Sequence, residues 1–167
     1  RSTMQFWDQH KTITDYYELL AGRVCARYDL TQMEYDILMF LHSNPQHNTA
    51  ADIVMIRKST KSHVSVSLKS LERKGLIRRV QNKSNKKRIE ITLTERSAPI
   101  IDAGTQVQAQ FSKDVLSGLT QEEKDICISI FCRIHDNADE CMRKYKEEQN
   151  EKEQLQAKDA GSDGGNL

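Results

Sequence analysis

The alternating spacing of four and three between mainly apolar residues predicts a helix at the start of the chain. Its stripe comprises Phe6, His10, Ile13, Tyr17, Leu20 and Val24. A second helix is predicted in "LTQMEYDILMFL" (residues 30–41), where Thr31 and Glu34 have the spacing of a capping box. The loop "SNPQHN" should end it.

Two shorter helices with a tight break between them are predicted next, an arrangement typical of a helix-turn-helix. In the first, residues 49–58, Thr49 is the expected N-cap and Asp52 lies near the positive helix end. The second spans residues 61–75 and ends at Gly75. Its core face should hold Val64, Leu68 and Leu71, which leaves an opposite, exposed face of Lys61, Ser62, Ser65, Val66 and Lys69, with His63 at its edge.

The stretch "LIRRVQNKSNKKRIEITLT" (residues 76–94) predicts a β-hairpin with strands 76–80 and 88–93 and a polar, positive loop. In the second strand Ile89, Ile91 and Leu93 alternate, so these three should share a buried face. A two-stranded hairpin is marginally stable alone, so it should pack on the preceding helices.

Helical patterns resume after the hairpin. The first, with Ser97–Pro99 in or near its first turn, has a stripe of Ile100, Gly104, Val107, Phe111 and Val115. Thr120 and Glu123 again have capping-box spacing, before a last helix with the stripe Ile126, Ile130, Ile134 and Ala138. Beyond about Lys146 apolar residues nearly vanish, which predicts a disordered tail.

Positive charge is concentrated in one segment of the 167 residues. Residues 57–88 hold 12 of the 25 Lys and Arg residues and one acidic residue, Glu72, and so carry a net charge of +11 within a chain of +1. Such a segment is the electrostatic signature of nucleic-acid contact, although a solvated charged face would look similar. The hydrophobic content of 37% is low for a single globule, so either a partner subunit completes the core or part of the chain is unfolded.

The other composition signals argue against secreted, membrane-spanning, metal-binding and catalytic proteins. The four cysteines lack CxxC or secreted-scaffold spacing. The longest apolar run (Ile37–Leu41) is too short to span a bilayer, and no signal-peptide pattern opens the chain. We therefore expect a cytoplasmic location. Cys132 and His135 have metal-ligand spacing, but two ligands do not make a zinc site. We find no phosphate loop, nucleophile elbow or HExxH motif, and predict neither catalysis nor a cofactor.

Small hydroxyls and flexible cations on an exposed helix face suit the major groove of B-DNA. The positive hairpin after that helix has the character of a wing that reaches phosphates or the minor groove. A plain polar helix followed by a hairpin with a solvated tip is the alternative.

The chain resembles the MarR family of winged helix-turn-helix regulators over about residues 5–145. The resemblance rests on "LTQMEYDILMFL", "STKSHVSVSLKSLERKGLIRRV" and "NKKRIEITLTERS". At the wing tip, Asn85 and Lys87 replace the Asp and Arg common in the family, and His63 and Val66 stand where Thr and Arg are frequent. The operator bases of relatives therefore should not carry over.

The resemblance implies a mainly α fold with a two-stranded β wing, in which N- and C-terminal helices form a dimerisation region. It implies a winged-helix domain over residues 4–146, with a DNA-binding lobe at 30–94, dimerisation helices at 4–28 and 95–146, and a polar tail at 147–167. The expected function is that of a ligand- or stress-responsive repressor binding a pseudo-palindromic operator as a homodimer. The expected DNA-binding residues are Thr49, Lys61, Ser62, His63, Ser65, Val66, Lys69, Arg73, Lys83, Lys86, Lys87 and Arg88.

Members of the family often respond to phenolic or other small ligands in a cleft between the two regions. Residues that could line such a cleft for a small aromatic ligand are Tyr16, Tyr17, Cys25, Tyr28, Met33, Tyr35 and Met39. A Met and aromatic set at helical spacing is more often core. Cys25 could also serve in redox sensing, but a buried, inert thiol is the simpler interpretation. The functional alternatives are a winged-helix module for protein–protein contact and a DNA binder without sequence preference.

Overall fold

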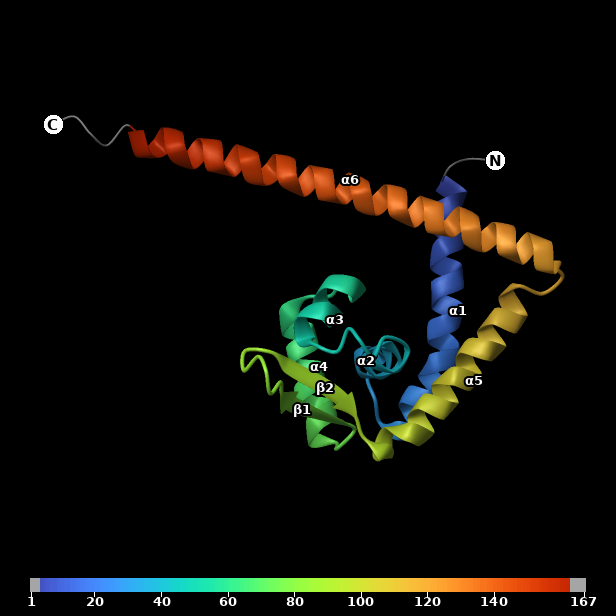
Figure 1. Cartoon of the computed structure of the whole chain (residues 1–167). Helices are drawn as coiled ribbons and strands as arrows, with labels where there is room; N and C mark the ends of the chain where they lie inside the picture. Colours follow the sequence, from blue (N-terminus) through green and yellow to red (C-terminus); the bar gives the residue numbers. More distant parts are fainter. Residues whose placement is uncertain (1–3, 163–167) are drawn as a thin grey trace. The chain divides into compact units, whose positions relative to one another are not determined.

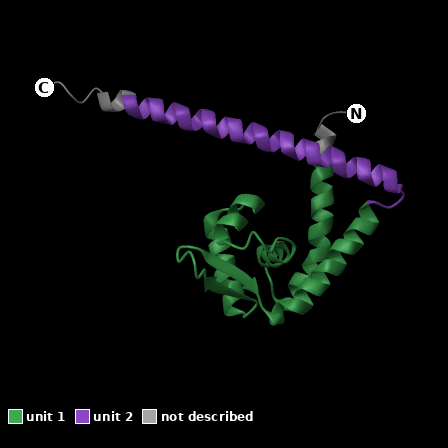
Figure 2. Ribbon diagram, in the orientation of Figure 1, with its two compact units in different colours: residues 1–115 green, residues 116–167 purple. Residues whose placement is uncertain are grey.

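The computed structural model describes residues 4–162, and describes side chains from residue 8 to residue 158. The chain divides into two units after Val115 (Figure 2). The second unit contains α6 (Gln121–Ser162). The first contains α1 (Met4–Tyr28), α2 (Gln32–Ser43), α3 (Ala50–Arg57), α4 (Lys61–Arg73), β1 (Ile77–Gln81), β2 (Ile89–Leu93), a 3-10 turn (Glu95–Ser97) and α5 (Ala98–Val115). The predicted fold class, mainly α with a two-stranded wing, is confirmed.

Within the first unit, α3, α4 and the hairpin lie on one side, α1 and α5 pack along each other on the other side, and α2 lies between them (Figure 1). The core forms where these layers meet. α2 contributes a nearly continuous buried run, in which Tyr35, Ile37 and Leu38 are fully enclosed. Its stretch Ile37–Leu41 is apolar at every position, which is possible because this part of the helix is covered on several sides.

The stripe of α1 is buried only toward its C-terminal end. Val24 is buried in the core, whereas Ile13 is 46% exposed. Phe6, also part of the predicted stripe, lies outside the residues whose side chains are described. The N-terminal half of α1 therefore presents apolar surface that this unit does not cover.

The hairpin is antiparallel and pairs Arg79 with Ile91 and Gln81 with Ile89. Ile91 is buried as predicted, but Ile89 is 50% exposed, so the expectation of a fully buried face was wrong. Ile89 lies on the last rung of the ladder, next to the wing loop. β1 buries only its first residue, Ile77, and β2 buries only its central residue, Ile91. Alternation sets the direction of a side chain, but its burial depends on how far the covering helices extend.

Three Thr residues cap helices as the sequence predicted, and two of the capping boxes are complete. Thr49 with Asp52 and Thr120 with Glu123 make both reciprocal hydrogen bonds. At α2 the Thr31 hydroxyl accepts from the Glu34 amide at 3.1 Å. The Glu34 carboxylate, however, binds Lys74 instead of returning to the cap.

The last helix is longer than predicted. α6 continues to Ser162, so the expectation that order ends near Lys146 was wrong for residues 147–162, while 163–167 lie outside the described residues. The stretch is rich in Glu, Lys, Gln and Ala, which favour helix, and has no Pro. Arg143 additionally bridges Glu140 and Glu147 at helical spacing. Among the described residues, no helix is both long and apolar enough to cross a bilayer.

Candidate nucleic-acid interface

α4 buries one face and exposes the other. Val64 and Leu68 are 1% exposed and Leu71 is fully buried, which confirms the predicted core face. Ser67 and Ser70 are also buried on this side. The opposite side is exposed and presents the predicted set: Lys61, Ser62, His63, Ser65, Val66, Lys69 and Arg73.

The start of α4 is fixed by a short, well-bonded turn. Lys58 adopts a left-handed conformation (φ 52°) that ends α3 and reverses the chain. The Thr60 hydroxyl then caps α4 by accepting a hydrogen bond from the His63 amide at 3.3 Å. Thr49, predicted to contact DNA, uses its hydroxyl to accept from Asp52 at the start of α3. Its structural role is thus that of a cap, and a DNA contact there stays a prediction.

The wing loop, residues 82–88 between β1 and β2, is held by side-chain amides. The Asn82 Oδ1 atom accepts from the backbone and hydroxyl of Ser84 at 2.9 and 2.7 Å and from the Asn85 amide at 2.9 Å. The Asn85 Oδ1 atom accepts from the Lys87 amide at 3.2 Å. These bonds are Asx turns, in which an Asn side chain accepts from the backbone that follows it. They leave the cationic side chains of Lys83, Lys86 and Lys87 exposed on the loop.

The base of the wing is bonded to the segment before α3. The Ile91 amide donates to the Asn48 carbonyl at 2.7 Å. The Arg88 guanidinium donates to the Asn48 side chain and to Glu90, both at 3.3 Å. Sequence reasoning missed Asn48 and Asn82. The Asn-x-Ser spacing at the loop was a signal for Asn82, whereas Asn48 acts across 40 residues and had none.

Lys74 connects the end of α4 to the junction of α1 and α2. Its ammonium donates to the Asp29 carbonyl at 2.5 Å and to the Glu34 carboxylate at 2.7 Å. Asp29 is left-handed (φ 52°) and follows the end of α1, where unpaired carbonyls favour a cation. The Glu34 side chain is 5% exposed. This lysine therefore binds two segments that precede it by 40 residues or more.

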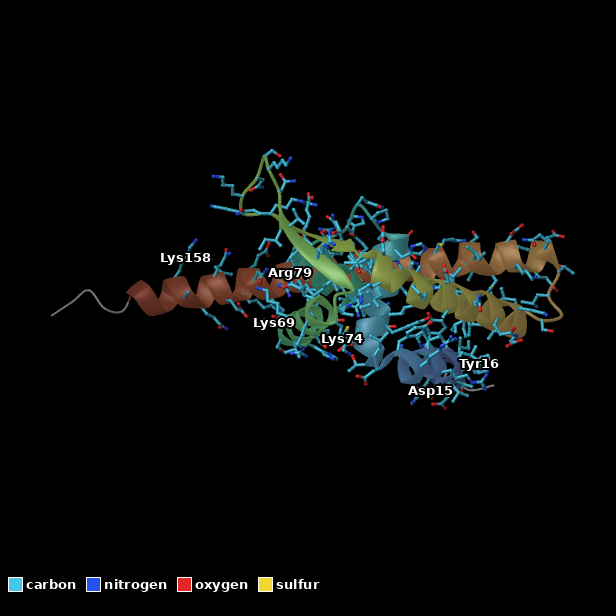
Figure 3. All side chains as sticks on the ribbon, turned by 90° about the horizontal axis from the view of Figure 1, so that it is seen from below. Asp15, Tyr16, Lys69, Lys74, Arg79 and Lys158 are labelled. Atoms are coloured by element: carbon cyan, nitrogen blue, oxygen red, sulfur yellow. The ribbon has the colours of Figure 1, made fainter. Side chains whose placement is uncertain are left out.

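Ion pairing divides the positive segment into two groups. Arg57 with Asp36, Lys74 with Glu34, Arg79 with Glu72 and Arg88 with Glu90 form pairs between 2.7 and 3.3 Å. In the part of the chain with described side chains, no ion pair involves Lys61, Lys69, Arg73, Arg78, Lys83, Lys86 or Lys87. Figure 3 shows Lys69, Lys74 and Arg79 around α4 and the hairpin, apart from Asp15 and Tyr16 on α1. Uncompensated charge is therefore concentrated on the outer face of α4 and on the wing.

The seven predicted ligand-binding residues do not meet at one place. Tyr35 and Cys25 are buried in the core, and Met33 packs against it. Burial raises the pKa of the Cys25 thiol, so the reactive thiolate is disfavoured. Burial and the hydrogen bond with Tyr17 raise the pKa of Tyr35. Tyr16 donates to Asp114 on α5 at 2.5 Å, and this bond lowers the pKa of Asp114.

Two hollows of the first unit are lined in part by residues that the sequence predicted to bind a ligand. One, of about 350 Å³, is lined by Tyr17 and Met39 together with Asp36, Arg57 and Gln108. Burial raises the pKa of Asp36 above its usual value, although Arg57 opposes the shift. The other, of about 450 Å³, is lined by Tyr28, Arg73, Lys74, Leu76, Arg96 and other residues. No group of three metal-binding side chains occurs among the described residues.

Comparison with known proteins shows what part of this chain is similar to. The MarR family matches residues 28–88, from the end of α1 to the end of the wing loop. The HTH-type transcriptional regulator PecS of Dickeya dadantii is 27% identical over 114 residues, which are 67% of this chain and 69% of PecS.

Solved structures share the fold. The MepR–DNA complex of S. aureus has a TM-score of 0.64 at 23% identity, covering 81% of this chain and 94% of MepR. A MarR family transcriptional regulator from Listeria monocytogenes, complexed with a 26mer DNA, has a TM-score of 0.71 at 20% identity, covering 82% and 89%. The family match, the relative and the shared winged-helix fold agree with the motifs in the sequence. Residues 28–88 thus match the MarR family, and the chain shares the winged-helix fold of these solved structures.

Proposed function

We propose that this regulator is a cytoplasmic repressor that binds duplex DNA sequence-specifically, with α4 in the major groove and the wing loop on the adjacent backbone or minor groove. The observation that carries the proposal is the division of charges. Cations that stabilise the fold are paired with acids, and Arg88 at the base of the wing pairs with Glu90. The other cations on the outer face of α4 and on the wing loop have no acidic partner among the described side chains: Lys61, Lys69, Arg73, Lys83, Lys86 and Lys87. Uncompensated Lys and Arg are the groups that release counterions on binding phosphates. The DNA complexes of MepR and of the Listeria relative support the same use of this fold.

The proposed DNA-binding groups have separable roles. Lys87 on the wing loop contacts phosphate, so Lys87→Ala weakens binding to all sequences alike and reduces the salt slope by about one. Ser62 and Lys69 on α4 contact base edges, so replacing either with Ala also blurs sequence preference. Lys158→Ala, which removes an equal charge from α6, is the matched control.

Titrating duplex DNA at two salt concentrations with these variants tests the proposal. Steep salt dependence that Lys87→Ala reduces and Lys158→Ala leaves intact supports it. Binding that ignores salt, or no binding to any duplex, contradicts it. Equal affinity for an enriched operator and its scrambled version would favour the non-specific binder. Retention of an acidic protein without retention of DNA would favour the protein-contact module.

We further infer that the functional form is a homodimer on a pseudo-palindromic site. Apolar side chains that one chain leaves exposed support this: Ile13 and Leu19 on α1, and Ile126, Ile130, Phe131 and Ile134 on α6. Leaving such stripes in water forgoes about 25 cal/mol for each Å² that a partner could cover. Light scattering should give twice the 19.2 kDa of one chain, and a monomer at micromolar concentration contradicts the inference.

The signal that releases DNA is proposed to be a small aromatic molecule in the hollow lined by Tyr17, Met39 and Arg57. The location supports this, since Arg57 ends α3 while Tyr17 belongs to α1. A ligand there would bias the position of the helix-turn-helix relative to α1 and α5. Calorimetric titration with a simple phenol tests it: binding by the wild type that Tyr17→Ala weakens supports the site, and equal binding by both excludes it.

A further inference from the structure

Val66 differs in chemistry from its neighbours on the outer face of α4. The face is otherwise polar, yet Val66 is 66% exposed, whereas Val64 two residues earlier is 1% exposed in the core. An isolated exposed valine is common on protein surfaces. Its position makes this one informative, because Ser62 four residues before it and Lys69 three residues after it are both exposed on the same side of the helix.

The helix places Val66 centrally among the groups proposed to enter the major groove. α4 begins at Lys61, so Val66 is its sixth residue and lies on the second turn. Ser62 and Ser65 precede it on the exposed side, and Lys69 and Arg73 follow. A recognition helix contacts base edges with its N-terminal residues. A side chain at this position therefore faces a base edge when the helix is docked.

The chemistry of the groove leaves one suitable partner for an apolar side chain. Guanine, cytosine and adenine present hydrogen-bond donors or acceptors in the major groove, and thymine alone also presents a methyl group. Packing valine against a donor or acceptor removes water from it without replacing the hydrogen bond, which is unfavourable. Packing it against the thymine methyl buries apolar surface on both sides.

We propose that Val66 reads the C5-methyl group of a thymine, so that the preferred operator has an A·T pair at one defined position of each half-site. This deepens the proposed function and rests on it, since it requires α4 to lie in the major groove. 5-Methylcytosine carries the same methyl group, so a methylated C·G pair at that position is recognised better than an unmethylated one.

The test begins with an operator enriched from a random duplex pool by the purified full chain. Each thymine of that operator is then replaced by uracil, which removes the methyl group and keeps every hydrogen-bonding group. We expect one thymine per half-site at which this change weakens wild-type binding about fourfold, the contribution of one buried methyl group. Replacing that thymine by cytosine, and its paired adenine by guanine, should weaken binding further, and 5-methylcytosine in place of the cytosine should restore part of the loss.

Two variants identify the residue responsible. Val66→Ala should bind the thymine operator more weakly and lose the sensitivity to uracil at that position. Val80→Ala removes the same atoms from a valine that is 51% exposed on β1, and should keep the wild-type sensitivity. Circular dichroism and thermal unfolding establish that both variants are folded.

The outcomes are distinct. Operator binding without any uracil-sensitive thymine overturns the proposal, as does sensitivity that persists in Val66→Ala or a selection without an invariant thymine. If Val66→Ala changes neither DNA affinity nor uracil sensitivity, the exposed valine does not read DNA and serves another contact. Failure of the wild type to bind any duplex overturns the proposed function itself.

Discussion

Removing the ammonium of Lys74 tests whether the end of α4 is held by this side chain. In Lys74→Met the apolar stem is retained, but Glu34, only 5% exposed, keeps a carboxylate without its cation. The carbonyl of Asp29 at the end of α1 also loses its donor. Unpairing a buried charge is much more costly than losing an exposed pair.

The expected loss can be worked from the burial of the pair. Breaking a fully buried ion pair costs about 3–5 kcal/mol. The Lys74 side chain is 29% exposed, and water lessens the penalty, so we expect a loss of about 2–3 kcal/mol in the free energy of unfolding. For a chain of this size that loss corresponds to a decrease of about 4–12 °C in Tm.

Urea and thermal unfolding at neutral pH and fixed protein concentration measure the effect. Lys11→Met is the matched control, because Lys11 pairs with Asp15 at the same 2.7 Å but both side chains are more than half exposed. The control should leave the free energy of unfolding nearly unchanged, because an exposed ion pair contributes little to stability. Adding Glu34→Gln to Lys74→Met should recover part of the loss, since no buried charge remains unpaired. Equal stability of the two lysine variants, or strictly additive losses in the double variant, would refute the reasoning.

Three further predictions concern other parts of the first unit. Gly22→Ala should stabilise the protein by about 0.5–1 kcal/mol, because its new Cβ meets nothing within 4 Å. At Gly104 the new Cβ would meet the Met39 sulfur, so Gly104→Ala should be about 1–3 kcal/mol less stable than Gly22→Ala in urea unfolding. Cys25, buried and with a raised pKa, should react with maleimide at neutral pH far more slowly than the exposed Cys132; equal rates in single-cysteine variants would contradict this. The pKa of Asp36 is higher in the folded protein than its usual value of 3.8. The protonated side chain therefore stabilises the fold below pH 3.8, and this stabilisation is lost as the pH rises through the folded-state pKa. The stability of Asp36→Asn relative to the wild type should therefore increase from acid to neutral pH, and a flat difference would exclude the effect.

The faces of α4 were predictable because burial followed helical period. Val64, Leu68 and Leu71 are spaced four and three apart, and one side of a helix packed on a core must be apolar. Once that face is assigned, the exposed positions of Ser62, Ser65 and Lys69 follow without further information. The predictable part of the candidate interface is therefore the part set by local geometry.

The features that were not predictable depend on contacts distant in sequence. Thr31 and Glu34 have the spacing of a capping box, but the Glu34 carboxylate binds Lys74, which lies 40 residues later in the chain, instead of the N-cap amide. Ile89 alternates correctly and still lies half exposed, on the rung of the hairpin next to the wing loop. Local pattern cannot specify either outcome, since both are decided by which elements come together in the fold.

The Asx turns of the wing loop are formed by neutral groups, while Asn82 and Arg88 also donate to the Glu90 carboxylate at the base of the wing. Asn82 and Asn85 direct the turn with uncharged oxygens, and the bonds they accept come from amides and a hydroxyl. Ionic strength weakens interactions between charges and leaves such dipolar bonds nearly unchanged. An affinity measured in concentrated electrolyte therefore reports mainly lost attraction to phosphate, because the Asx turns themselves do not depend on charge. Substituting either asparagine by aspartate would combine these two effects and make the turn itself responsive to electrolyte.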